Sequence, residues 1–127
     1  MELQEIEKQR ILVVEDEPVI GHVCQRVLAS QGFSVDVASD GKKAIDSLHD
    51  RYYDLCILDL RMPGIDGIQL YKYLTDNDHE LSQSVIFTTG DITGSEAAKF
   101  LSSSGKVYLQ KPFTPRELIT AVELALN

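Results

Sequence analysis

The chain has 127 residues, of which 43% are hydrophobic and 25% charged, a composition that fits one globular domain and argues against a disordered chain. Its formal net charge is -8. Such an acidic surplus repels phosphate backbones and anionic lipids, so we expect no direct contact with nucleic acid or membrane. The sequence shows no transmembrane-length apolar run and no signal peptide, and its two cysteines lie in apolar stretches. These features predict a cytoplasmic domain with reduced, buried thiols.

The first half of the chain alternates short β-rich runs with amphipathic helical stretches. We expect a strand over residues 10–14 and a helix that begins at Pro18 and is ended by Gly32. The apolar face predicted for this helix consists of Val19, Ile20, Val23, Val27 and Leu28. Residues 33–38 alternate apolar and polar side chains, which is typical of a strand near a sheet edge, and a second helix opens at Asp40.

The second half of the chain repeats this alternation three times. The further strands are expected at 54–58, 84–88 and 106–109. The further helices are expected after Asp66, near 96–101 and from Pro115, the last with a capping box over 114–117. Strands that are apolar on both faces and alternate with helices predict a single α/β domain of the doubly wound, flavodoxin-like (βα)5 type, with parallel strands in the order 2-1-3-4-5. We expect it to cover residues 9–127, after a leader or linker end over 1–8.

Carboxylates follow the two strands that form the centre of this predicted sheet. Glu15 and Asp16 end the first strand and Asp59 ends the third. Because ligands of such sheets bind outside the carboxyl ends of the strands, we expect these three side chains to converge there. Like charges this close need a compensating cation, and oxygen ligands with open water positions suit Mg²⁺, with Mn²⁺ as an alternative.

A hydroxyl and an ammonium group complete the predicted site. Thr88 and Thr89 end the fourth strand, and Lys111 follows the fifth. A phosphoryl group on Asp59 would have one oxygen on the metal, one near Lys111 and one near Thr89, which stabilises phosphoryl transfer through position and charge. An aspartate nucleophile is a known route to a covalent phosphoenzyme. These residues therefore predict a phosphoryl-accepting site.

Four segments, each at the carboxyl end of a predicted strand, match in order the motifs of a known family. They are I-L-V-V-E-D-E-P at 11–18, D-L-C-I-L-D-L-R-M-P-G-I-D-G at 54–67, V-I-F-T-T-G at 85–90 and Y-L-Q-K-P-F at 108–113. Over about residues 9–127 the chain resembles the receiver domain of two-component response regulators. The run over 104–108 lacks the Gly-Ala pair common in receivers. Together with the T-T-G-D run at 88–91 and the F-L-S-S-S-G run at 100–105, it looks like receivers fused to hybrid sensor histidine kinases.

The resemblance implies a role for each acidic residue of the site. Asp59 is implied to be the phosphoacceptor. Asp16 is implied to bind the metal directly and Glu15 largely through water, with the backbone carbonyl of Arg61 as a further ligand. Glu17 is expected to act mainly as the N-cap of the first helix.

The resemblance also implies the switching residues. Thr89, rather than Thr88, matches the switch hydroxyl, and Tyr108 matches the aromatic residue that changes rotamer with it. Lys111 matches the phosphate-contacting lysine, and the bond from Lys111 to Pro112 is expected to be cis.

A mechanism and a set of partners follow from this family. The implied reaction is Mg²⁺-dependent transfer from the phosphohistidine of a histidine kinase or phosphotransfer protein to Asp59. The modified domain would then switch a surface formed by the fourth helix, fifth strand and fifth helix, which binds a downstream protein or fused domain. The domain would catalyse its own modification and slow dephosphorylation without turning over an external substrate.

Other functions and plainer roles fit these residues less well. A haloacid-dehalogenase-like phosphohydrolase needs an aspartate two residues after the nucleophile, where this chain has Arg61. A flavin-binding module needs a phosphate-binding loop rich in Ser, Thr and Gly after the first strand, and a degenerate receiver would lack the intact site.

Arg61 is expected to pair with Asp91 and hinder attacking water, with two unpaired charges as the alternative. The histidines, expected to be solvated and without a role, are His22, His49 and His79.

Overall fold

The computed structural model describes residues 8–90 and 95–127 of the chain. Its centre is a five-stranded parallel sheet of order β2-β1-β3-β4-β5, as predicted. The strands are β1 (Arg10–Val14), β2 (Ser34–Ala38), β3 (Leu55–Asp59), β4 (Val85–Thr89) and β5 (Val107–Gln110). The helices are α1 (Pro18–Ser30), α2 (Gly41–Asp50), α3 (Gly67–Asn77), α4 (His79–Ser82), α5 (Ser95–Ser104) and α6 (Pro115–Leu126). The predicted (βα)5 architecture is confirmed.

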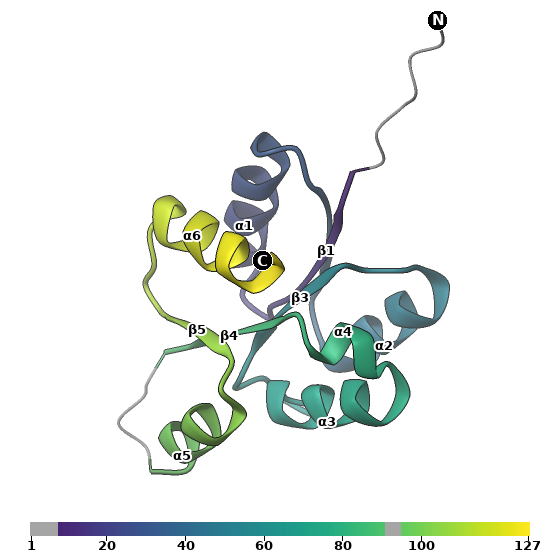
Figure 1. Cartoon of the computed structure of the whole chain (residues 1–127), viewed down its shortest axis with the longest axis vertical. Coiled ribbons are helices and arrows are strands. Elements are labelled where there is room, and N and C mark those ends of the chain that lie inside the picture. The colour runs from purple at the N-terminus through teal and green to yellow at the C-terminus, as the bar shows by residue number, and fades with distance from the viewer. Residues whose placement is uncertain (1–7, 91–94) are drawn as a thin grey trace, which may run out of the picture.

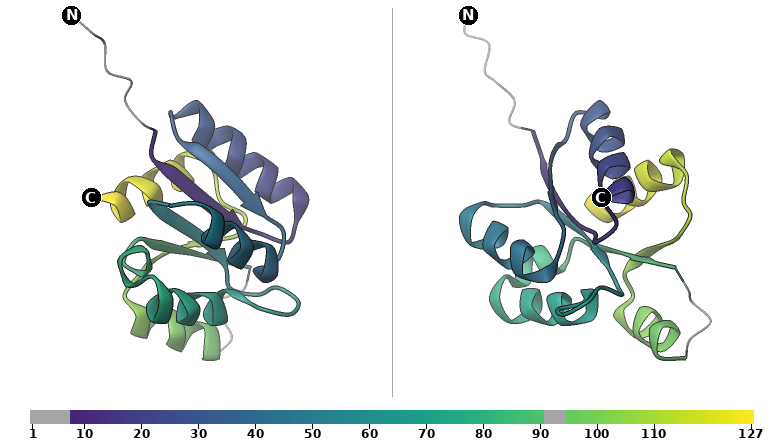
Figure 2. Two further views of the ribbon diagram at one scale, coloured as in Figure 1. Left: turned by 90° about the vertical axis from the view of Figure 1, so that its right-hand side faces the viewer. Right: turned by 180° about the vertical axis from the view of Figure 1, so that it is seen from behind.

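The sheet is the middle one of three layers (Figure 1). Helices α1 and α6 cover one face, and α2, α3 and α5 cover the other, as the view from behind in Figure 2 also shows. Alternate strand residues enter the two apolar cores between these layers. The α1 and α6 core takes strand residues Ile11, Val13, Leu55, Ile57, Ile86 and Leu109. The opposite core takes Leu12, Val14, Cys56, Leu58, Val85 and Phe87. Every residue of β3 and β4 is buried, which explains their continuous apolar sequence.

Helix α1 begins at Pro18 as predicted, but its predicted apolar face is wrong at two positions. Val19 and Val23 are 75% and 44% exposed, while the buried residues of the helix are Gly21, Cys24 and Leu28. A Cβ atom added to Gly21 would lie 3.0 Å from Cγ1 of Val37 in β2. The small residue therefore lets this side of the helix approach the sheet closely, and Val19 and Val23 turn outward.

Hydrogen bonds between residues close in sequence cap other helices, and two of the features observed were not predicted. The predicted capping box of α6 is present, with Thr114 accepting from the backbone N–H of Glu117 and Glu117 from that of Thr114. Asp66 and Gln69 form a second capping box at the start of α3, which was not predicted. The single-turn helix α4 was not predicted either; Asp78 accepts a hydrogen bond from a backbone N–H in it.

The parallel arrangement gathers all five carboxyl ends of the strands at one edge of the sheet. In register, Asp59 on β3 lies beside Thr88 on β4. Lys111 follows β5 directly, and its N–H donates to the carbonyl of Thr89 at 2.7 Å. The peptide bond between Lys111 and Pro112 is cis, as expected. Among the described residues, no helix is both long and apolar enough to cross a membrane.

Candidate functional site

The ammonium group of Lys111 lies among three carboxylates at the carboxyl edge of the sheet. Its Nζ is 2.8 Å from Oε1 of Glu15, 3.1 Å from Oδ2 of Asp59 and 3.4 Å from Oε1 of Glu17. These contacts join the end of β1, the end of β3 and the loop after β5. The structure therefore brings Glu15 and Asp59, two of the three carboxylates expected to converge, together around Lys111.

Two of these carboxylates are buried, which strongly affects their protonation. Burial raises the pKa of Glu15 to about 7; the hydrogen bond with Lys111 opposes this shift, and the hydrogen bond and repulsion with Asp59 add to it. Burial also raises the pKa of Asp59, although hydrogen bonds from Glu15, Lys111 and the N–H of Arg61 oppose this shift. Burial alone would lower the pKa of Lys111, but its hydrogen bonds to the two acids raise it instead. The site thus holds more negative charge than one lysine compensates.

The acidic residues after β1 form a compact oxygen-rich group. One carboxylate oxygen each from Glu15, Asp16 and Glu17 lies within 4.8 Å of the others. Asp59 contacts this group through its hydrogen bond with Glu15. Glu15, Asp16, Glu17 and Asp59 together form the acidic cluster. A set of carboxylate oxygens with excess negative charge, partly open to solvent, fits a hard divalent cation such as Mg²⁺.

Glu17 belongs to this cluster, although the sequence suggested mainly a capping role. Its backbone is the N-cap of α1, but its side chain makes no capping hydrogen bond. Its N–H donates to Oε2 of Glu15 at 3.1 Å, while its carboxylate approaches Lys111. The uninterrupted E-D-E run at 15–17 was the available signal in the sequence.

The loop after β3 holds the Asp59 carboxylate from the other side. The N–H of Arg61 donates to Oδ1 of Asp59 at 3.2 Å, while the Arg61 side chain is exposed. Gly67 is needed beneath this loop, because an added Cβ atom would collide with the backbone carbonyl of Asp59. Asp91, the expected partner of Arg61, lies outside the described residues, so that pairing stays a prediction.

The proposed switching residues occupy the next two strands. Thr88 and Thr89 are both buried, and Thr89 is the last residue of β4. Tyr108 lies on β5 opposite Phe87 in register and is 45% exposed. Thr89 thus lies at the carboxyl end of β4, whereas Tyr108 lies one residue before Leu109, which pairs with Thr88.

The sequence of the chain matches one family model over most of its length. The model describes the response regulator receiver domain and matches residues 11–123. The chain belongs to this family. Receiver domains of this family are phosphoacceptor modules of two-component signal transduction, and the predicted resemblance is confirmed.

The curated relatives that the chain matches are longer proteins. The transcriptional regulatory protein PcoR of Escherichia coli is 35% identical over 119 residues, covering 94% of this chain and 52% of PcoR. The DNA-binding response regulator MtrA of Mycolicibacterium smegmatis is 32% identical, covering 94% of this chain and 51% of MtrA. The receiver domain thus spans about half the length of the curated relatives it matches.

Solved structures agree with the fold of this receiver domain. The receiver domain of the Francisella response regulator 1452 superimposes with a TM-score of 0.80 at 30% identity, covering 94% of this chain and 97% of that one. The response regulator TrrA of Thermotoga maritima, solved in complex with Mg(2+)-BeF, gives a TM-score of 0.79 at 30% identity, covering 93% of this chain and 99% of that one.

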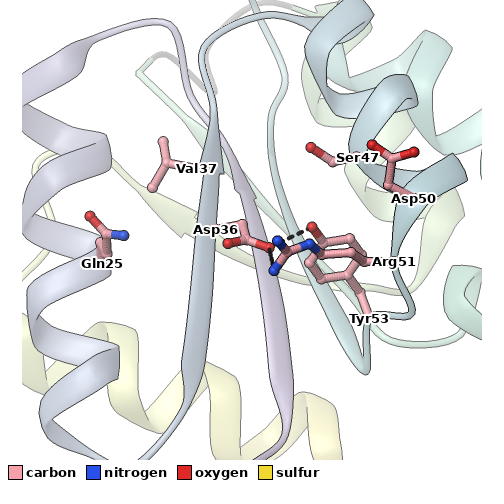
Figure 3. A pocket seen from close by; sticks show the side chains of 7 residues that line it. All are labelled: Gln25, Asp36, Val37, Ser47, Asp50, Arg51 and Tyr53. Atoms are coloured by element: carbon pink, nitrogen blue, oxygen red, sulfur yellow. Dashed lines mark hydrogen bonds and ion pairs between the residues drawn. The ribbon is translucent and has the colours of Figure 1, made fainter.

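Two hollows on this receiver domain differ in character. A small apolar one of about 190 Å³ borders the acidic cluster and is lined by Val19, Ile20, Val23, Lys111, Pro112 and Phe113. A larger polar groove of about 540 Å³ follows the outer edge of β2 (Figure 3). There Asp36 accepts from the hydroxyl of Tyr53 at 2.7 Å and pairs with Arg51 at 3.7 Å. These contacts connect the segment just before β3 to the edge strand β2, and they do not involve the acidic cluster.

Proposed function

We propose that Asp59 accepts a phosphoryl group from the phosphohistidine of a histidine kinase or phosphotransfer protein. One observation carries this assignment: Lys111 lies 3.1 Å from Oδ2 of Asp59, whose carboxylate is almost completely buried. A lysine in that position can neutralise a phosphoryl oxygen as it arrives. The neighbouring acids would hold the Mg²⁺ ion that receiver domains use.

The transfer forms a bond from a carboxylate oxygen of Asp59 to phosphorus and breaks the bond from phosphorus to the donor nitrogen. Asp59 must be ionised to attack, and Lys111 and the N–H of Arg61 stabilise that form. Asp16, Asp59 and the backbone carbonyl of Arg61 would bind Mg²⁺ directly, and Glu15 would bind it largely through water. When bound, Mg²⁺ neutralises the charge that develops on the phosphoryl oxygens.

Thr89 and Tyr108 would convert this local change into a change of surface. The Thr89 hydroxyl would move toward a phosphoryl oxygen on Asp59, as the adjacent carboxyl ends of β3 and β4 allow. The half-exposed ring of Tyr108 would then turn inward into the space so released. The surface of α5, β5 and α6, which are the predicted fourth helix, fifth strand and fifth helix, would thereby change its affinity for a downstream protein or a fused domain.

The apolar hollow beside Lys111 supports a protein as the physiological donor. Val19 and Val23 are exposed on α1, next to Pro112 and Phe113. Exposed apolar side chains at the rim of a charged site provide contact area for a partner without adding charge. A phosphohistidine carried by a docked protein would reach Asp59 from this side.

The output of the whole protein depends on what the receiver domain acts upon. The relatives are named as a transcriptional regulatory protein and a DNA-binding response regulator. The acidic receiver itself would not bind nucleic acid. Its own reactions would be limited to self-phosphorylation and slow dephosphorylation, in the cytoplasm. Fusion to a hybrid histidine kinase stays a prediction that these relatives do not test.

Intact-protein mass spectrometry tests the assignment of Asp59. Wild type incubated with acetyl phosphate and Mg²⁺ should gain one phosphoryl group, and hydroxylamine should remove it as expected for an acyl phosphate. Asp59→Asn should gain none, while Asp54→Asn, which alters an exposed aspartate five residues away, should behave like wild type. Equal modification of Asp59→Asn would refute the assignment.

A further inference from the structure

The Glu17 carboxylate lies on the solvent side of the acidic cluster. Its side chain is 61% exposed, whereas those of Glu15 and Asp59 are almost completely buried. Although Glu17 is the N-cap of α1, its side chain is directed to Lys111 rather than to the helix N–H groups. The carboxylate therefore acts on the ammonium group and not on the helix end.

The Lys111 ammonium has three N–H donors, and a carboxylate oxygen from each of three residues lies within 3.4 Å of its nitrogen. Glu15 and Asp59 hold it from inside at 2.8 Å and 3.1 Å, and Glu17 holds it from outside at 3.4 Å. A phosphoryl oxygen that approaches Asp59 needs one of these donors. The longest and most solvated contact, that of Glu17, costs least to break.

We infer that Glu17 is a gate that determines donor specificity, because its carboxylate competes with an incoming phosphoryl group for Lys111. This inference rests on the proposed role of Asp59. A small anionic phosphodonor must displace the carboxylate and also approach its negative charge. A donor docked on the apolar hollow gains binding energy from contacts remote from the phosphoryl group, which offsets that competition. Glu17 thus favours docked protein donors over free phosphate esters and anhydrides.

Phosphorylation by acetyl phosphate in Mg²⁺, followed by mass spectrometry at several ionic strengths, tests this gate. Glu17→Gln should react roughly two- to fivefold faster than wild type at low salt, because one nearby charge is removed. The difference should shrink at high salt, where the charge is screened. Glu17→Asp keeps the charge and should stay closer to wild type. Glu123→Gln removes an exposed carboxylate near the end of α6 and should change nothing.

A binding measurement separates the gate from a change in chemistry. Titration with beryllofluoride, a phosphoryl mimic, in Mg²⁺ should show tighter binding to Glu17→Gln by a similar factor. Slower phosphorylation of Glu17→Gln would instead mean that Glu17 positions Lys111, and would overturn the gate. Equal rates and equal salt dependence would overturn it as well. Failure of wild type itself to become phosphorylated would count against Asp59 as acceptor, so the two failures are distinguishable.

Discussion

Replacement of Glu15 by Gln should remove a pH dependence of stability that the buried acidic cluster creates. The pKa of Glu15 is raised from its ordinary value of 4.5 to about 7 in the folded protein. Between these two values the unfolded chain has released the proton while the folded chain still binds it. The free energy of unfolding therefore falls as pH rises through this range, and the loss is complete above the folded pKa.

The size of this effect follows from the two pKa values. A shift of one pKa unit corresponds to about 1.4 kcal/mol, so wild type should lose roughly 2–3 kcal/mol of stability between pH 5 and pH 8 through Glu15. Gln cannot titrate, and Lys111 keeps Asp59 and Glu17 as partners in the variant. Glu15→Gln should therefore show a correspondingly flatter stability profile across this range.

Urea unfolding in EDTA at several pH values measures this difference. The comparison uses the change between pH 5 and pH 8 within each protein, so that any constant effect of the substitution on packing cancels. Glu123→Gln is the matched control, since its carboxylate is exposed on α6. Parallel profiles for wild type and Glu15→Gln would refute the claim that burial and Asp59 raise the pKa of Glu15.

Four further outcomes test other parts of the structure. Mg²⁺ should raise the thermal midpoint of wild type at pH 8, and Asp16→Asn should largely lose this effect in differential scanning calorimetry if Asp16 is a metal ligand. Gly67→Ala should cost about 1–3 kcal/mol in urea unfolding, because the new methyl group meets the Asp59 backbone; no loss would contradict that contact. Phe87→Ala should cost about 3–5 kcal/mol, since Phe87 is fully buried against the rings of Tyr71 and Phe100, and Phe87→Leu should cost less. Tyr53→Phe should lower the free energy of unfolding by about 1 kcal/mol, because the hydrogen bond to Asp36 is lost. Absorbance should show that Tyr53 ionises near pH 12, and ionisation near pH 10 would contradict the burial of its hydroxyl.

The sequence determined the order of elements and the chemistry at the strand ends. Continuous apolar runs predicted central parallel strands, because a strand covered by helices on both faces has no side that favours polar residues. Parallel order then required Glu15, Asp59 and Lys111 to meet at one edge, since all carboxyl ends point the same way. The capping box at Thr114 is equally local, because its two hydrogen bonds join residues three positions apart.

Tertiary packing decided what local patterns left open. Val19 and Val23 are apolar and helically spaced, yet they face outward because Gly21 allows the opposite side of α1 to approach Val37. The side chain of Glu17 does not cap α1; instead it accepts a hydrogen bond from Lys111, which is 94 positions away in the chain. Helical periodicity cannot specify such choices, because the free energy that fixes them comes from contacts between elements that meet only in the folded protein.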